Sequence, residues 1–192
     1  MRRSPEGTRR AAVVLAALAM VLTISGCFAE EDPTPTTVPV PSATPIFASE
    51  EEALAAAEEA YSAYLELSDQ IGADGGQGVD RLIPYVTKGQ LEEERQNFEE
   101  YEEEGFSTRG STSLVNFQIQ RPPTLDQGVT SLSAYACLDA SKLRVFDAAG
   151  KEVTTPNRQQ KQTFQVDFEL RPEVSGQFLL NGMEIWSGEA LC

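Results

Sequence analysis

The residues that could perform chemistry in this chain are carboxylates, tyrosines and cysteines, because its 192 residues include no histidine. A Ser-His-Asp triad and a histidine-based zinc site are therefore excluded. The candidate catalytic carboxylates are Asp80, Asp139 and Asp167. Asp80 stands at the start of an expected helix, where a carboxylate suits the helix dipole. Asp139 and Asp167 alternate along their strands with apolar residues, so they should lie on the opposite face of the sheet from those residues. This predicts that both are solvated, unless a β-bulge exchanges the two faces.

These patterns favour a protein that is not an enzyme, with no catalytic residue, although an aspartate base remains the alternative. The sequence also predicts no cofactor and no metal. Residues 92–104 hold eight glutamates but no calcium-binding loop, so they predict a solvated helix face. The glycine-rich segment 72–78 lacks the Gly-Lys-Ser/Thr ending of a phosphate-binding loop and is expected to be a flexible connection.

Five aromatic residues form a candidate pocket lining. They are Tyr61, Tyr64, Tyr85, Tyr135 and Trp186. Aromatic side chains of this kind can line a site for a small hydrophobic ligand, or they can fill the core. The sequence leaves both interpretations open.

The helical pattern begins the globular region, which we place at residues 49–192. Ser49 and Glu52 match a capping box, which is typical of a helix start. The second helix is expected to turn Leu82, Ile83 and Val86 inward and to be disturbed by Pro84. Thr87 is expected to cap the third helix. The expected helices span residues 49–68, 79–86 and 87–104.

After the expected helices, apolar residues recur about every 2 residues instead of about every 3.6, which is typical of strands. The prolines at 122 and 123 are expected to end the first strand, and Asn181-Gly182 to form a turn inside the last. The expected strands span residues 115–121 and 132–138, a hairpin at 143–153, and residues 164–170 and 178–186. Helices followed by antiparallel strands predict an α+β fold, with the helices packed on one face of a curved sheet.

Residues 1–26 have the features of an export signal. Four arginines precede an apolar run at 11–24, which is shorter than a membrane span. The run ends in Ile24-Ser25-Gly26-Cys27, which resembles the lipobox of bacterial lipoproteins. The resemblance implies cleavage between Gly26 and Cys27, a lipid on the Cys27 thiol, and a location on the extracytoplasmic face of the cell membrane. An ordinary signal peptide or an uncleaved anchor is the alternative.

Residues 27–48 are expected to be an extended linker between lipid and domain. Five prolines alternate with threonine and valine in this segment, which disfavours both helix and sheet. Fully extended, about 20 such residues would span roughly 60 Å.

Cys137 and Cys192 remain once Cys27 is lipidated. An even pair outside the cytoplasm predicts a disulfide, and two free thiols are the alternative. Loop-closure entropy for about 55 residues gives roughly 4 kcal/mol of stabilisation as an upper value.

The net charge of the chain restricts which kinds of partner it can bind. The chain carries 15 basic and 30 acidic residues, a net charge of −15. Residues 1–26 contain four arginines and one glutamate, so their removal leaves −18. Nucleic-acid binding and electrostatic adhesion to an anionic membrane are therefore disfavoured, and the lipid must supply the membrane anchor.

The order of elements over 49–192 resembles the nuclear transport factor 2-like cone fold. The likeness rests on the first helix with Tyr61 and Tyr64, on residues 82–87, and on the last strand around Trp186. It implies a conical pocket between sheet and helices, and related domains often dimerise through the sheet. The fold hosts isomerases, cyclases and many non-enzymes, so it does not fix the function.

Our leading hypothesis is a non-catalytic accessory or binding module at the cell envelope, with an envelope protein or a small ligand as its partner. A small-ligand carrier and a histidine-free isomerase or cyclase are the alternatives.

Overall fold

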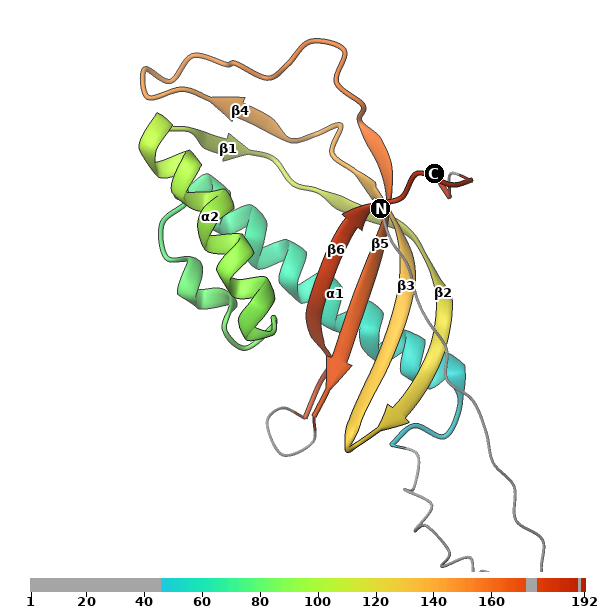
Figure 1. The fold of residues 1–192 in the computed structure, drawn as a ribbon. Helices are drawn as coiled ribbons and strands as arrows, with labels where there is room; N and C mark the ends of the chain where they lie inside the picture. The colour runs from blue at the N-terminus through green and yellow to red at the C-terminus, as the bar shows by residue number, and fades with distance from the viewer. Residues whose placement is uncertain (1–45, 172–175, 190) are drawn as a thin grey trace, which may run out of the picture. The chain divides into compact units, whose positions relative to one another are not determined.

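In a computed structural model, which describes residues 46–171, 176–189 and 191–192, the chain has an α+β fold. Helices α1 and α2 lie on one side of a four-stranded antiparallel sheet, and a separate two-stranded sheet extends beyond them (Figure 1). In chain order the elements are α1 (Glu50–Ala73), the 3₁₀ helix η1 (Val79–Leu82), α2 (Lys88–Glu104), β1 (Ser107–Arg109), β2 (Ser113–Asp126), β3 (Val129–Asp139), β4 (Arg144–Phe146), β5 (Lys161–Leu170) and β6 (Leu179–Ile185).

The main sheet has the strand order β2-β3-β5-β6, with every neighbouring pair antiparallel. Strand alternation gives it an apolar inner face, represented by Ala134 and Val166, and a polar outer face, represented by Ser133 and Asp167. Strands β1 and β4 pair with each other in the smaller sheet. The expected succession of helices and antiparallel strands is confirmed.

Aromatic rings fill the space between α1 and the inner face of the main sheet. Tyr61 is fully buried and meets the ring of Phe117 at 6.0 Å and that of Phe168 at 6.0 Å, measured between ring centroids. Phe178, also fully buried, continues this group from Phe168. Close-packed rings of this kind leave little room for a guest molecule between helix and sheet.

Helix α1 begins as expected but ends later. The Ser49 side chain accepts a hydrogen bond from the Glu52 amide at 3.2 Å, and Glu52 accepts one in turn from the amide of Ala48 at 2.7 Å. The helix continues to Ala73 rather than to about Ser68. It continues because Ile71, fully buried, extends the apolar face by another turn.

The second expected helix is much shorter than predicted. Only Val79–Leu82 is helical, in 3₁₀ geometry, before the chain turns at Pro84. Val86 is buried as expected and forms a parallel bridge with Leu180 of β6. The sequence placed Ile83 inward, but this residue is 55% exposed. The third expected helix is confirmed, with Thr87 as its N-cap and Glu104 as its last residue.

Two strand predictions were wrong for the same physical reason. β2 does not end at the prolines of 122 and 123, and β6 does not turn at Asn181-Gly182. β2 is an edge strand with a register shift between Arg121 and Thr124, where missing amide hydrogens are tolerated. In β6, Asn181-Gly182 lies at a register shift opposite Asp167, so the strand continues through this pair. Bulges thus absorb residues that would otherwise interrupt a strand.

The hairpin expected at 143–153 forms only in part. A single bridge joins Phe146 to Glu152, and the main partner of β4 is β1, 35 residues or more earlier in the chain. The connection at 72–78 is closely packed: a Cβ at Gly76 would overlap the carbonyl oxygen of Phe98 in α2. Its left-handed backbone, with φ of 88°, also favours glycine.

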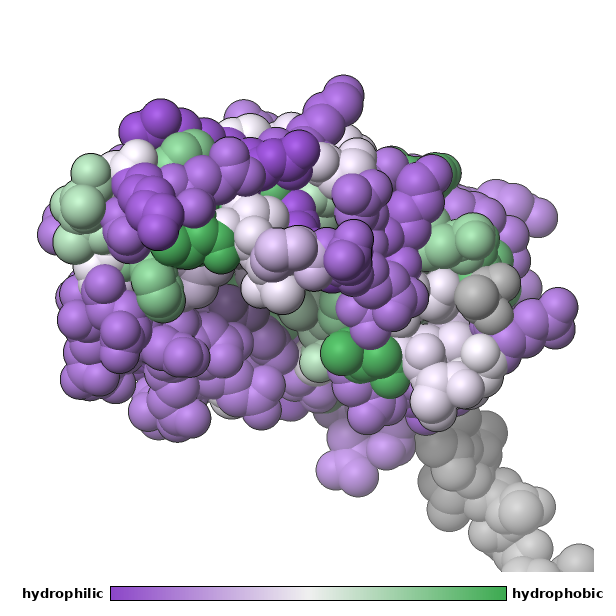
Figure 2. All heavy atoms as spheres, turned by 90° about the horizontal axis from the view of Figure 1, so that it is seen from above, coloured by the Kyte–Doolittle hydropathy of each residue, from purple (hydrophilic) through white to green (hydrophobic). Residues whose placement is uncertain are grey.

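Hydrophilic residues dominate the surface of the domain seen from above (Figure 2). Hydrophobic residues there form small, separate groups rather than one large patch. Large apolar patches mark many protein interfaces. The face in this view is therefore mainly polar and charged.

Candidate functional site

A cleft of about 490 Å³ runs beside α1, where this helix passes the segment that joins β1 to β2. This α1 cleft is defined here by Ser62, Leu65, Glu66 and Asp69 of α1 together with Thr112 and Leu114. The helical members are spaced three or four residues apart, which places them along one side of the helix. The volume falls within the range of typical small-molecule sites.

The Asp69 carboxylate is the most constrained polar group of the α1 cleft. Its Oδ2 accepts a hydrogen bond from the Thr112 amide at 2.8 Å, and its Oδ1 accepts one from the Thr112 hydroxyl at 3.2 Å. Burial raises the pKa of Asp69, while the two hydrogen bonds from Thr112 oppose that rise. The side chain is half-buried, so one part faces Thr112 and another part remains open to the cleft.

Glu66 supplies a second carboxylate one turn before Asp69 and is exposed. Among the described residues, no lysine or arginine forms an ion pair with either side chain. Leu65 and Leu114 add apolar surface to the same cleft. The α1 cleft thus combines negative charge with an apolar wall.

The wall opposite α1 is held by a close backbone contact at Gly110. Its φ is 95°, and a Cβ there would overlap the carbonyl oxygen of Lys142. Only glycine accommodates both features. The contact fixes the start of the segment that carries Thr112 and therefore the donors that orient Asp69.

A second polar site, the Glu94 cluster, consists of Tyr64, Gln90 and Glu94 and lies between α1 and α2. Glu94 is only 4% exposed. Its Oε1 accepts hydrogen bonds from the Tyr64 hydroxyl at 2.6 Å and from the Gln90 side-chain amide at 2.8 Å. Within the described part of the chain no basic residue forms an ion pair with Glu94. Two neutral donors therefore stabilise this buried carboxylate.

The tyrosines beside Glu94 are held in their neutral form. Burial raises the pKa of Tyr64 well above its ordinary value, and the nearby Glu94 charge raises it further. The same two causes, burial first, raise the pKa of Tyr61, whose hydroxyl lies 3.2 Å from the Met183 sulfur. Both phenols therefore keep their protons near neutral pH and can donate hydrogen bonds.

The sequence interpretation missed Glu94 and Asp69. Glu94 was counted with the solvated glutamates of 92–104, most of which are indeed exposed. Its position between Leu91 and Phe98, three residues after one and four before the other, would have indicated the buried face. Asp69 was missed because the first helix was expected to end at Ser68.

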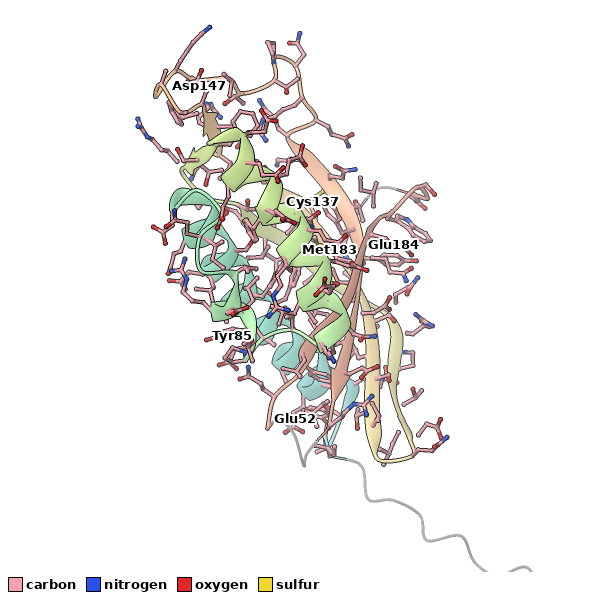
Figure 3. All side chains as sticks on the ribbon, turned by 60° about the vertical axis from the view of Figure 1, so that its left-hand side comes forward. Glu52, Tyr85, Cys137, Asp147, Met183 and Glu184 are labelled. Carbon is pink, nitrogen blue, oxygen red and sulfur yellow. A yellow bond between two sulfur atoms is a disulfide. The ribbon has the colours of Figure 1, made fainter. Side chains whose placement is uncertain are left out.

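The five aromatic residues expected to line a pocket lie in separate places. Tyr61 and Tyr64 are in the core, with ring centroids 5.8 Å apart. Tyr135 and Trp186 contact each other at 4.8 Å on the outer side of the main sheet. Tyr85 follows η1 and bonds through its backbone to Leu180 of β6; Figure 3 shows it far from Cys137, a neighbour of Tyr135 along β3. They are thus divided between both faces of the sheet.

The predicted disulfide joins Cys137 of β3 to Cys192. It holds the residues after β6 against the outer face of the sheet, where the Leu191 amide also donates to the Thr163 hydroxyl at 2.9 Å. Cys137 and Thr163 are buried there despite their position on the polar face. Disulfides of this kind are typical of proteins in oxidising compartments.

The carboxylates proposed for catalysis are occupied by other contacts. Asp139 accepts from the Ser141 amide at 2.8 Å, and this contact with Ser141, aided by Lys161, lowers the pKa of Asp139. Asp167 pairs with Arg121 at 3.0 Å and accepts a hydrogen bond from Ser133 on the outer face. Strand parity predicted the faces of both correctly. Asp80, in the first turn of η1, pairs with Arg95 of α2 at 2.7 Å.

The proposed lipidation and cleavage positions, Gly26 and Cys27, lie outside the described residues, as does most of the linker at 27–48. Across the part of the chain that is described, no helix has both the length and the apolar character needed to cross a membrane. In that same part, no group of three or more histidine, cysteine, aspartate or glutamate side chains is arranged to hold a metal ion.

No family model matches this chain, and neither does any curated protein. Among solved structures, it is similar to the intermembrane space region of the chloroplast protein ARC6, with a TM-score of 0.50 and 11% identity. That match covers 69% of this chain and 95% of the other. A de novo designed β-sheet protein matches with a TM-score of 0.28 and 13% identity, over 74% of this chain and 97% of the design. The ARC6 similarity supports the α+β arrangement alone.

Proposed function

We propose that this chain is a lipid-anchored, extracytoplasmic binding module that performs no catalysis. Its anchor is the lipid on Cys27, supported by the basic start, the short apolar run and the Ile24-Ser25-Gly26-Cys27 motif. The Cys137–Cys192 disulfide supports an oxidising location outside the cytoplasm. The linker at 27–48 would hold the domain away from the bilayer.

The observation that carries the binding role is the α1 cleft on a domain with a tightly packed core. The cleft offers one oriented carboxylate, a second exposed carboxylate and an apolar wall. By contrast, the aromatic rings around Tyr61 occupy the interior that a carrier of hydrophobic ligands would need. We therefore favour recognition at the surface over carriage inside a cone.

For the fold, we propose membership of the nuclear transport factor 2-like group. The support is the order of elements, with a long N-terminal helix against one face of an antiparallel sheet. Dimerisation through the outer sheet face, which related domains use, would here have to accommodate the segment held by the disulfide.

The alternative function is a histidine-free enzyme that uses Asp69 as its base. It is favoured by one observation: a carboxyl with a raised pKa lies in a cleft. The phenols that could serve as proton donors, Tyr61 and Tyr64, are committed to Met183 and Glu94 in the core. A base without an opposing acid is a weak basis for isomerase chemistry, so we rank this function second.

The proposed function is tested on the full chain expressed in a bacterial host. Wild-type protein should partition with membranes and carry a lipid on its N-terminal cysteine, detected by mass spectrometry, whereas Cys27→Ser should be released. Cross-linking in intact membranes, followed by native mass spectrometry of the detergent-extracted chain, should then detect a bound partner or ligand. An unlipidated chain contradicts the anchor. A lipidated chain without any bound species contradicts the binding role.

A further inference from the structure

We propose that the α1 cleft binds an alkylammonium group, meaning a protonated amine on a short apolar chain. The group would come either from a free amine or from a lysine side chain of a partner. This inference rests on the proposed binding function and specifies its ligand. It follows from the charge, the shape and the rigidity of the cleft.

The α1 cleft carries two carboxylates, those of Glu66 and Asp69. Glu66 and Asp69 share one cleft, and no basic side chain of the described residues pairs with either. Burial disfavours the charged form of the Asp69 carboxyl and raises its pKa. A cation in the cleft would offset that cost.

Apolar surface lies next to the carboxylates of the cleft. Leu65 and Leu114 border the same cleft as Glu66 and Asp69. Both leucines pack against the core, and only part of their surface borders the cleft. A bare metal ion would leave that part facing water, whereas a short methylene chain would cover it. Amines with an apolar stem and a charged end match such mixed surfaces.

Asp69 can orient a ligand because its carboxylate is already held in place. The two hydrogen bonds from Thr112 fix the carboxylate, and the close contact at Gly110 fixes the segment that carries Thr112. Preorganised groups of this kind lower the entropic cost of binding. The net charge of −15 further favours the approach of cations over anions.

The first probe is n-butylammonium, with n-butanol and butyrate as neutral and anionic controls of the same chain length. The sample is the full chain carrying Cys27→Ser, labelled with nitrogen-15. The Thr112 amide is the reporter, because its hydrogen is donated to Asp69. A saturable shift of its NMR signal with butylammonium, and none with butanol or butyrate, supports the proposal. A capped Gly-Lys-Gly peptide tests the lysine source in the same way.

Substitutions identify the site. Glu66→Gln should weaken butylammonium binding about threefold to tenfold, as expected for one partly exposed charge pair. Glu58→Gln removes the same charge from an exposed position of α1 outside the cleft, and should leave the affinity within twofold. Asp69→Asn should weaken binding at least as much as Glu66→Gln. If it alters the 110–114 segment, Glu66→Gln remains decisive because Glu66 makes no hydrogen bond within the described residues.

The proposal is overturned if neither ammonium probe shifts the Thr112 signal, if butanol binds equally well, or if Glu66→Gln and Glu58→Gln behave alike. Binding of a neutral or anionic probe in the cleft would refute the ligand class and leave the binding module intact. The binding module itself fails only in the separate membrane cross-linking experiment, so the two failures are distinguishable.

Discussion

The α1 cleft and the Glu94 cluster show two ways in which one domain keeps carboxylates away from bulk water. Glu94 is nearly inaccessible and receives two hydrogen bonds from side chains on α1 and α2. Asp69 also receives two hydrogen bonds, both from Thr112, but its remaining surface faces an open cleft beside Glu66. The two carboxylates therefore differ in burial. Glu94 is enclosed and links α1 to α2, whereas Asp69 is open on one side to the cleft.

Under the proposed function, the Glu94 cluster contributes to stability and the α1 cleft to recognition. Substitution at Glu94 should therefore change the free energy of unfolding strongly. Substitution of a cleft carboxylate should change that free energy little and binding more. The predictions below test this division, beginning with the largest expected effect.

Glu94→Ala should lower the free energy of unfolding by about 2–4 kcal/mol, because it opens a cavity and leaves the Tyr64 hydroxyl and the Gln90 amide without their acceptor. Urea unfolding followed by Trp186 fluorescence measures the change. Glu93→Ala, at the exposed neighbouring position, should stay within about 0.5 kcal/mol of wild type. Glu94→Gln keeps an acceptor and should fall between the two. Equal effects at 93 and 94 would contradict a structural role for the cluster.

Gly110→Ala should lower the free energy of unfolding by about 2–3 kcal/mol, because the new Cβ forces the cleft wall away from Lys142. The displaced wall should also remove butylammonium binding. Gly128→Ala is a matched control, since Gly128 also has a positive φ but open space around its Cβ position. That control should lose only the backbone contribution, about 1 kcal/mol. Similar losses for both variants would show that the contact with Lys142 is unimportant.

Local signals predicted most of the fold, and long-range pairing explains most of the failures. The capping box at Ser49 and the cap at Thr87 depend on residues within one turn, and both are confirmed. The extension of α1 to Ala73 depends instead on a place for Ile71 in the core, which no local rule provides. Likewise, β1 pairs with β4 because the chain returns to it from far away.

The candidate site was harder to predict than the fold, for a related reason. The cleft needs Asp69 from α1 and Thr112 from the segment just before β2, which are 43 residues apart. Their meeting depends on the path of the chain after α2, including the glycine at 110. Glu94 could have been found, since its spacing from Leu91 and Phe98 already placed it on the apolar side of α2.

Asp69→Asn should change stability by less than about 1 kcal/mol, because the carboxyl is only half-buried and water screens its charge. The sign depends on pH. Burial raises the pKa of Asp69 in the folded state, so the folded protein holds this proton to a higher pH than the unfolded chain. The Asp69 carboxyl therefore adds to the free energy of unfolding of the wild type at low pH. This contribution is lost as pH rises through the folded-state pKa.

The stability of Asp69→Asn relative to wild type should consequently increase with pH across the acidic range and level off near neutrality. Parallel urea titrations at several pH values measure this difference. An amide can still accept from the Thr112 amide and donate to its hydroxyl, so the local contacts are preserved. A difference that is constant with pH would show that Asp69 has the same pKa in both states.

Glu66→Lys gives the smallest stability effect and the sharpest comparison, because it places an ammonium group in the cleft as part of the chain. Positions 66 and 69 are three residues apart on α1, so the introduced ammonium can reach the Asp69 carboxylate and contribute a few tenths of a kcal/mol. Any lysine also reduces the excess negative charge of the domain, and Glu58→Lys, outside the cleft, measures that general contribution. Glu66→Lys should therefore unfold at a slightly higher temperature than Glu58→Lys and should no longer bind butylammonium, whereas Glu58→Lys should bind it normally. If both variants unfold at the same temperature and both bind the amine, the two carboxylates of the α1 cleft act as ordinary solvated charges, and the contrast with Glu94 is one of burial alone.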